Sequence, residues 1–162
     1  MSLAEAEALS LRNAKNMIQG KSKLPSRGHT GSVWLPRLRR KIHYRSGLER
    51  RIFLEIDSYS LVTDIESEKL YIQYLWKGAR LNYVPDLILK LSNGRVWIIE
   101  IKPASLVSED QNQAKFAGAR KFCSNTGDHL QFGILTGRED VRRVLPAHQG
   151  ISLVEQQSRF AQ

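Results

Sequence analysis

The stretch RVWIIEIKP, residues 95–103, carries the strongest structural signal in this sequence of 162 residues. Apolar side chains occupy both alternating positions of the run, a pattern typical of a strand that is buried on both faces. Pro103 ends the strand because proline has no N–H group to donate to a neighbouring strand. The run therefore predicts a central strand in a sheet that is covered by other layers on both sides.

Two charged residues stand at the end of this buried strand. Glu100 and Lys102 are two positions apart, so their side chains point to the same face of the sheet. Asp86 lies 14 residues before Glu100, in an extended run that precedes the strand. Charges placed at the end of a buried strand need a partner, so these residues are the first candidates for a functional site.

The turn before the strand decides whether Asp86 shares the face of Glu100. A two-residue Asn-Gly turn places the two side chains on opposite faces of the sheet. A three-residue turn over 92–94, with its glycine in the left-handed conformation of a bulge, places Asp86 opposite Glu100 and Ile88 opposite Ile98. We predict the three-residue turn, and with it two carboxylates that face each other across a strand pair.

Two facing carboxylates repel each other unless a cation lies between them. Oxygen ligands without a nearby Cys or a His pair favour Mg²⁺ or Mn²⁺ over zinc. We expect Asp86 and Glu100 to hold such an ion, with the backbone carbonyl of Ile101 as a further oxygen ligand. Lys102 then lies beside a water molecule bound to this ion, as the group that orients or deprotonates it, and its positive charge can also lie near a phosphate.

Glu49 has two interpretations. Ser46 and Glu49 form a Ser-x-x-Glu capping box at the start of a helix predicted over 47–59, where the carboxylate reaches back to the Ser46 backbone. Glu49 also lies at the edge of the apolar face that packs onto the sheet, and from there it can reach the metal. The sequence leaves both open, capping alone and metal ligation.

Local patterns predict the remaining elements. In chain order these are a helix over 1–19, a flexible lead-in over 20–31, strands over 69–76 and 81–91, a helix from a second capping box at Ser108 to about Cys123, a strand over 130–136, a helix over 139–145 and a strand over 151–155. The three strands up to residue 102 are expected to pair antiparallel. The predicted fold is α/β, with a central mixed sheet flanked by helices, and residues 34–162 form a single domain after the lead-in of residues 1–33.

The charge balance favours a polyanionic partner. There are 25 Lys and Arg residues against 16 Asp and Glu, which gives a net charge of +9 and points to nucleic acid. Five basic residues interleave with Trp34 and Tyr44 in a segment that is either a DNA-gripping arm or an exposed loop with solvated charges. The candidate DNA-binding residues are Arg37, Arg39, Arg40, Lys41 and Arg45, together with Lys115 on the helix after the central strand.

Cysteine use and hydropathy point to a cytoplasmic location. Cys123 is the single cysteine, so there is no disulfide framework and no thiolate zinc site. No apolar run approaches the roughly 20 residues that span a bilayer, and no signal-peptide core is present. We expect a soluble protein of the reducing cytoplasm that does not insert into a membrane.

Three motifs together resemble a known family. A Pro-Asp step 14 residues before a Glu-x-Lys triplet is similar to the PD-(D/E)xK nucleases. The motifs RSGLE (45–49), YVPD (83–86) and IIEIKP (98–103) narrow the resemblance to the TnsA-type endonuclease subunit of heteromeric transposases, from about Trp34 to Arg138. The resemblance implies a restriction-endonuclease-like core.

The same resemblance implies a role and partners. A TnsA-type subunit cuts the 5′ ends of a mobile element, while a partner transposase of a different fold cuts and joins the 3′ ends and an ATPase regulates the assembly. Carried over by motif, Glu49, Asp86 and Glu100 hold the metal ions and Lys102 serves the attacking water. Two alternatives stay open: a mobile-element or phage nuclease of the same fold outside transposition, and a non-catalytic subunit that binds DNA or supports assembly.

Overall fold

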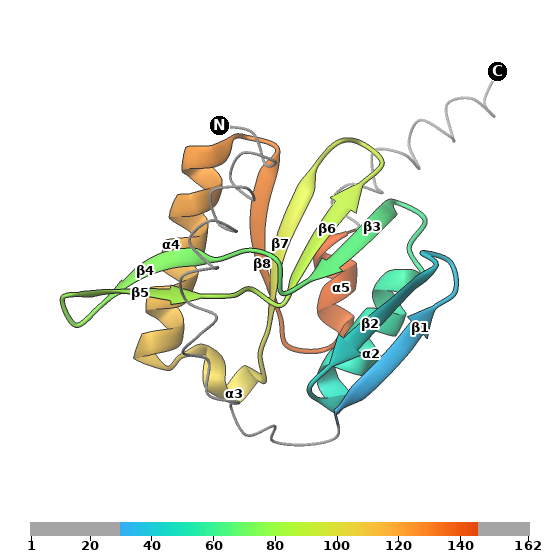
Figure 1. Ribbon diagram of the computed structural model, residues 1–162, viewed down its shortest axis with the longest axis horizontal. Helices are drawn as coiled ribbons and strands as arrows, with labels where there is room; N and C mark the ends of the chain where they lie inside the picture. The colour runs from blue at the N-terminus through green and yellow to red at the C-terminus, as the bar shows by residue number, and fades with distance from the viewer. Residues whose placement is uncertain (1–29, 146–162) are drawn as a thin grey trace.

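The computed structural model describes residues 30–145 (Figure 1). The helix expected over 1–19 and the strand expected over 151–155 lie outside the described residues. In chain order the elements are β1 (Gly31–Leu35), β2 (Arg40–Tyr44), α2 (Gly47–Asp57), β3 (Val62–Ser67), β4 (Ile72–Trp76), β5 (Ala79–Tyr83), β6 (Leu87–Leu91), β7 (Val96–Ile101), α3 (Ala104–Val107), α4 (Asp110–Thr126), β8 (Leu130–Leu135) and α5 (Arg138–Val144).

The central sheet is mixed, as the sequence predicts. Its strand order is β3-β6-β7-β8, with β6 antiparallel to both of its neighbours and β8 parallel to β7. Two hairpins, β1–β2 and β4–β5, form separate two-stranded sheets. The α4 crossover lies between β7 and β8, because parallel neighbours cannot be joined by a tight turn.

Both faces of the central sheet are covered, which confirms the prediction made from β7. Ile99 and Ile101 pack with α2, α5 and the β1–β2 hairpin, whereas Ile98 packs with α4 and the β4–β5 hairpin. Figure 1 shows these two groups of elements on either side of the strands. Each alternate position of β7 therefore enters a different core, and Glu100 shares the α4 side with Ile98. No helix within residues 30–145 is long and apolar enough to cross a bilayer.

The predicted register of β6 and β7 is confirmed. Ile88 pairs with Ile98 and Leu87 with Ile99, a register that puts Asp86 level with Glu100. The chain turns through residues 92–94, and Gly94 has a φ of 81°. This left-handed conformation is the one that glycine adopts without steric cost, and it closes the three-residue turn that sets the register of the site.

The strand assignment upstream of β6 was wrong in two places. Residues 72–76 do not join the central sheet but pair with β5, the other strand of a hairpin that packs against α4. The strand next to β6 is instead β3, for which the sequence analysis predicted no element. Its sequence, VTDIES, alternates only weakly, and Asp64 and Glu66 suit an edge strand that must not pair with a further chain. The extended run predicted over 81–91 is also divided, at residues 84–86.

The basic segment before α2 is neither a loop nor an isolated arm. It forms the β1–β2 hairpin, whose turn places Arg39 at a φ of 54°. The expected boundary between residues 33 and 34 falls inside β1. Leu35 and Ile42 are buried against α2, so the hairpin is part of the larger of the two cores.

The helix after the central strand does not begin with a Ser108 cap. Ser108 is the C-cap of the short helix α3, and α4 begins at Asp110 with Glu109 as its N-cap, so this prediction was wrong. After Pro103 the chain forms one helical turn, α3, before α4 begins. Ser108 follows this turn directly, so it does not cap α4. Gly127 ends α4, as predicted, and the helix reaches Thr126 rather than Cys123.

Candidate active site

The Asp86 side chain is fixed to the central strand by a backbone hydrogen bond. Asp86 directly precedes β6, and its Oδ2 accepts a hydrogen bond of 2.6 Å from the Ile101 N–H. This N–H belongs to the residue between Glu100 and Lys102. The Asp86 backbone in turn accepts a hydrogen bond from Glu68 N–H, at 3.3 Å. Asp86 is thus held from both neighbouring strands at one end of the sheet.

Glu100 is buried and incompletely paired. Its relative exposure is 6%, and its Oε1 lies 3.4 Å from Lys102 Nζ. Within residues 30–145, its Oε2 is buried and has no hydrogen-bond partner. An unpaired buried carboxylate oxygen is costly, so this atom marks a place where a further positively charged or donor group fits.

Both carboxylates of the site have a raised affinity for protons. Burial raises the pKa of Asp86 well above its usual range, and the charge of Glu100 raises it further. Burial also raises the pKa of Glu100, against the Lys102 ammonium, which lowers it. Two acidic groups thus lie close together at one end of the sheet, and within residues 30–145 the Lys102 ammonium is the cation at ion-pair distance from Glu100.

A second lysine faces the same site from α4. Burial lowers the pKa of Lys115, and the nearby Lys102 ammonium lowers it further, while Glu100 and Asp86 act in the opposite direction. Lys115 is half-buried. The sequence placed Lys115 among DNA-binding candidates, and the structure places its charge among Asp86, Glu100 and Lys102.

Glu49 is bound at the start of α2. Its backbone N–H donates to Ser46 Oγ at 3.1 Å, and its Oε2 accepts from the Arg45 N–H at 2.7 Å. The capping interaction therefore reaches Arg45, one residue before the expected Ser46. The Glu49 charge still raises the pKa of Asp86, so the two carboxylates are near neighbours. Even so, no three His, Cys, Asp or Glu side chains in the described part of the chain lie close enough to hold one metal ion.

Tyr83 is a buried neighbour of the site to which the sequence analysis gave no role. It is 7% exposed, and its hydroxyl has no hydrogen-bond partner among residues 30–145. Burial raises the pKa of this hydroxyl, and the charge of Glu100 adds to the effect. Its position three residues before Asp86 was the signal in the sequence, but only the fold shows that its hydroxyl is buried near Glu100.

The candidate DNA-binding residues of the β1–β2 hairpin fall into two groups. Arg37 donates to the backbone oxygens of Asp57 and Val62, Arg40 pairs with Asp64 at 3.1 Å, and Arg45 pairs with Glu68. By contrast, Arg39 and Lys41 are exposed and have no ionic partner within residues 30–145. Two of the five hairpin residues therefore present unpaired charge.

The site fits a small divalent cation. Asp86 and Glu100 supply carboxylate oxygens at one end of the sheet, and Glu100 Oε2 is an orphaned acceptor there. Oxygen donors of this kind are the ligands of Mg²⁺ and Mn²⁺. A cation between the carboxylates would remove their mutual repulsion and pair the orphaned oxygen. The Ile101 carbonyl as a further ligand stays a prediction.

The mixed sheet with helices on both faces is an α/β fold of the restriction-endonuclease-like class. The sequence model of the family described as "TnsA-like endonuclease N terminal" matches residues 60–137. This part of the chain is similar to the N-terminal domain of TnsA-like endonucleases, and the matched residues run from just before β3 to just after β8. Asp86, Glu100, Lys102 and Lys115 lie inside the match, and Glu49 lies before it. A comparison with curated proteins found no match.

Proposed function

We propose that this protein is a metal-dependent DNA endonuclease that hydrolyses phosphodiester bonds at the Asp86–Glu100–Lys102 site. The observation that carries the proposal is the buried, unpaired Oε2 of Glu100 beside the Asp86 carboxylate, within the segment that matches the TnsA-like endonuclease family model. If the two buried carboxylates had only a structural role, they would lower the stability of the fold with no compensating interaction. A cation site gives them a chemical purpose.

Asp86 and Glu100 would hold Mg²⁺ or Mn²⁺, and the bound ion would act as a Lewis acid on the phosphate and stabilise charge on the attacking and leaving oxygens. The hydrogen bond from Ile101 N–H holds Asp86 Oδ2 in place, which leaves its second oxygen for the ion. Glu49, tied to the Arg45 backbone, would position the site from the α2 side or bind the ion through its other oxygen.

Lys102 and Lys115 would serve the substrate. Lys102 Nζ is held near Glu100 Oε1, where it can orient or deprotonate the attacking water. Lys115 faces the same carboxylates from α4, and its lowered pKa reflects burial and the second ammonium nearby. The two ammonium groups would offset the negative charge of the two carboxylates, so that a negatively charged phosphate can bind at the site.

The experiment is a nicking assay on plasmid DNA with purified full-length protein in Mg²⁺ or Mn²⁺, alone and with its transposase. We expect cleavage by the parent, loss of cleavage in Asp86→Ala and Glu100→Gln, and a fall of about 10²- to 10⁴-fold in Lys102→Met. Lys90→Met is the matched control, because Lys90 lies at the other end of β6 and should keep parent activity. Parent-like cleavage by Asp86→Ala would refute the assignment.

We further propose that the cut is made at the 5′ ends of a mobile element, with a transposase as partner and an ATPase as regulator. The match of residues 60–137 to the TnsA-like family model supports this role. The test is to supply a duplex carrying an element end and to map the cut strand with and without the neighbouring transposase. Cuts confined to the 5′ ends support the proposal, and cleavage independent of the element end favours a nuclease outside transposition.

A further inference from the structure

The β4–β5 hairpin projects from the body of the protein beyond α4 (Figure 1). Its turn, Lys77–Gly78, has φ values of 48° and 75°, the pair of left-handed residues that closes a tight two-residue hairpin. One face of the hairpin is buried, through Tyr74 and Tyr83. This face lies so close to α4 that a Cβ on Gly118 would approach Tyr74 Cβ to 2.7 Å. The hairpin is therefore a rigid projection and not a loose loop.

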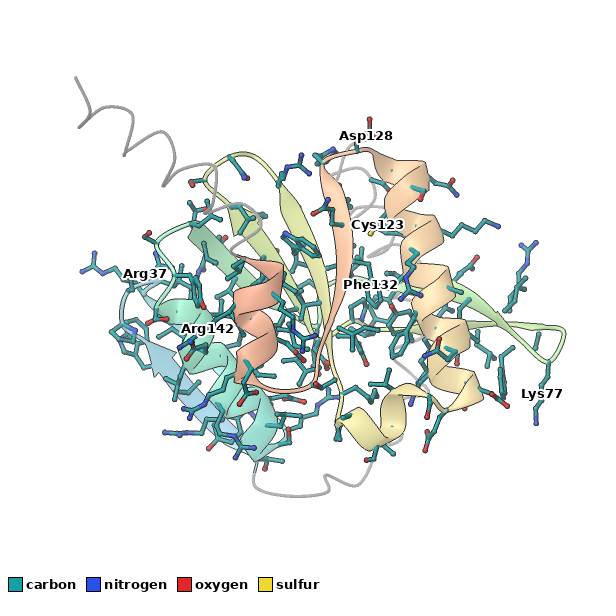
Figure 2. All side chains as sticks on the ribbon, turned by 180° about the vertical axis from the view of Figure 1, so that it is seen from behind. Arg37, Lys77, Cys123, Asp128, Phe132 and Arg142 are labelled. Carbon is teal, nitrogen blue, oxygen red and sulfur yellow. The ribbon has the colours of Figure 1, made fainter. Side chains whose placement is uncertain are left out.

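The opposite face of the hairpin is exposed and basic. Leu75 is 65% exposed, the highest value among the large apolar residues described, and its cross-strand partner is Arg80. Figure 2 shows Lys77 at the tip of the hairpin. Its Nζ lies 5.3 Å from the centre of the Trp76 ring. Residues 72–83 contain two basic residues, Lys77 and Arg80, and no acidic residue, while Lys69 before the hairpin pairs with Glu66 at 3.5 Å. The exposed face thus presents Arg80 beside Leu75, and the tip of the hairpin adds the positive charge of Lys77.

The hairpin is connected directly to the active site. β5 continues through residues 84 and 85 to Asp86. Figure 1 shows β4–β5 on one side of the central sheet and β1–β2 on the other. Figure 2 shows Arg37 of the β1–β2 turn and Lys77 at opposite ends of the molecule. The exposed basic residues of both hairpins, Arg39 and Lys41 in one and Lys77 and Arg80 in the other, therefore lie on either side of the site.

We propose that the β4–β5 hairpin is a second DNA-contacting element, which binds the phosphate backbone of a duplex on the opposite side of the active site from the β1–β2 hairpin. A two-stranded ribbon fits the major groove of DNA, where Lys77 and Arg80 would reach phosphates at the groove edges and Leu75 would meet the bases. The inference rests on the proposed nuclease function. The partner is DNA because the exposed face carries positive charge and no acidic group that a duplex would repel.

The test measures duplex affinity against salt concentration, without divalent metal, so that binding is separated from cleavage. In Lys77→Ala with Arg80→Ala we expect the slope of log affinity against log salt to fall by about 2, and affinity near 0.1 M salt to weaken at least about tenfold. The double variant Arg95→Ala with Lys121→Ala removes the same charge from the far end of β7 and from α4, and it should keep the parent slope.

Two further variants separate charge from structure and test both hairpins together. Lys77→Arg with Arg80→Lys keeps both charges and should keep the parent slope. Arg39→Ala with Lys41→Ala should lower the slope by about 2 again, and the combination of all four alanines by about 4, because each hairpin contacts its own phosphates. An additive loss supports simultaneous binding on both sides of the site.

The outcomes distinguish the two proposals. A parent protein without salt-dependent affinity for duplex DNA would overturn the nuclease function itself. A parent that binds, with Lys77→Ala and Arg80→Ala matching the Arg95 and Lys121 control, would overturn the role of the β4–β5 hairpin alone and leave its exposed face to a protein partner.

Discussion

Asp86 Oδ2 accepts a hydrogen bond of 2.6 Å from the backbone N–H of Ile101, the residue between Glu100 and Lys102. One side chain of the site is thereby fixed to the backbone that carries the other two. This link exists because Asp86 lies level with Glu100 across β6 and β7. The Ile101 N–H fixes the position of the Asp86 side chain. A substitution that keeps an acceptor oxygen can therefore remove the charge and leave this hydrogen bond in place.

Asp86→Asn keeps an oxygen that can accept from Ile101 and removes the charge. In EDTA we expect its melting temperature to equal or exceed that of the parent, because a buried charge next to Glu100 is relieved. With Mn²⁺ at about 100 times its Kd, the free energy of unfolding of the parent should rise by about 2.7 kcal/mol. Each kcal/mol corresponds to a rise of about 2 to 4 °C in melting temperature, and the variant should show no rise. Calorimetric melting with and without Mn²⁺ checks both.

Asp128→Asn is the control for that experiment. Asp128 lies in the turn before β8, and Figure 2 places it at an exposed end of the molecule. Its removal should leave the Mn²⁺-dependent rise at the parent value. An equal rise in Asp86→Asn would show that Asp86 is no metal ligand.

Arg37 and Lys41 belong to the same hairpin, but substitutions at the two positions should affect stability differently. The Arg37 guanidinium donates to the Asp57 and Val62 carbonyls, so Arg37→Met should lower the free energy of unfolding by about 1 to 3 kcal/mol. Lys41 is exposed, and Lys41→Met should change stability by no more than about 0.5 kcal/mol. Urea unfolding measures both variants.

The same pair separates folding from DNA binding. Below the unfolding transition, Lys41→Met should weaken duplex affinity, while Arg37→Met should keep the salt dependence of the parent. A reduced salt slope in folded Arg37→Met would instead assign Arg37 a phosphate contact, as the sequence suggested.

Asp140 should make stability depend on pH in the acidic range. Burial acts to raise the pKa of this carboxyl, but hydrogen bonds of 2.6 Å from the Thr136 N–H and hydroxyl, with the Arg143 guanidinium, outweigh it and lower the pKa. An acid with a lowered folded-state pKa stabilises the protein above its unfolded pKa, and the contribution is lost as pH falls through the folded value.

Asp140→Asn should therefore be less stable than the parent by about 1 kcal/mol at pH 7, and the gap should close as the pH falls below about 4. Chemical unfolding of both proteins between pH 3 and pH 7 gives the gap directly. Thr136→Val with Asp140→Asn tests the pairing, since the second substitution should then add little. A gap that stays constant with pH would contradict the ionised carboxylate.

Gly118→Ala should loosen the β4–β5 hairpin from α4. The added Cβ would lie 2.7 Å from Tyr74 Cβ and 2.9 Å from the Gln73 carbonyl oxygen, and neither atom is the free end of a flexible side chain. We expect a loss of about 1 to 3 kcal/mol of stability, despite the better helix propensity of alanine. Ser124→Ala, at an exposed position of the same helix, is the control and should be neutral or slightly stabilising. Stability equal to the parent would mean that the hairpin can move away from α4 at no cost.

Local sequence was enough to predict the elements whose patterns are strong. The run over 95–103 predicted the doubly buried strand β7, and Ser46 predicted the start of α2 through its side-chain cap. The three-residue turn over 92–94, with Gly94 in the left-handed conformation, predicted the register of β6 and β7, whereas a two-residue turn would have shifted it by one position. These features are decided within a few residues of one another, so sequence alone carries them.

Partner choice between distant strands could not be predicted in the same way. Residues 72–76 alternate as clearly as an inner strand does, yet they pair only with β5, while the weakly patterned β3 pairs with β6. Hydrogen bonding between backbones is the same for every sequence, so the choice depends on which side chains the helices cover. Ser108 likewise had a capping pattern, but the short helix α3 took its place.

The amino-acid sequence by itself determined that Asp86, Glu100 and Lys102 would share one face of a strand pair, because side-chain direction alternates along a strand and the turn sets the register. Only the tertiary structure decided which other charges join them. Lys115 reaches the site from α4 and Glu49 is held beside it by the Arg45 backbone, since both positions depend on how helices pack onto the sheet. Packing contacts between distant segments, and not local conformation, therefore completed the site.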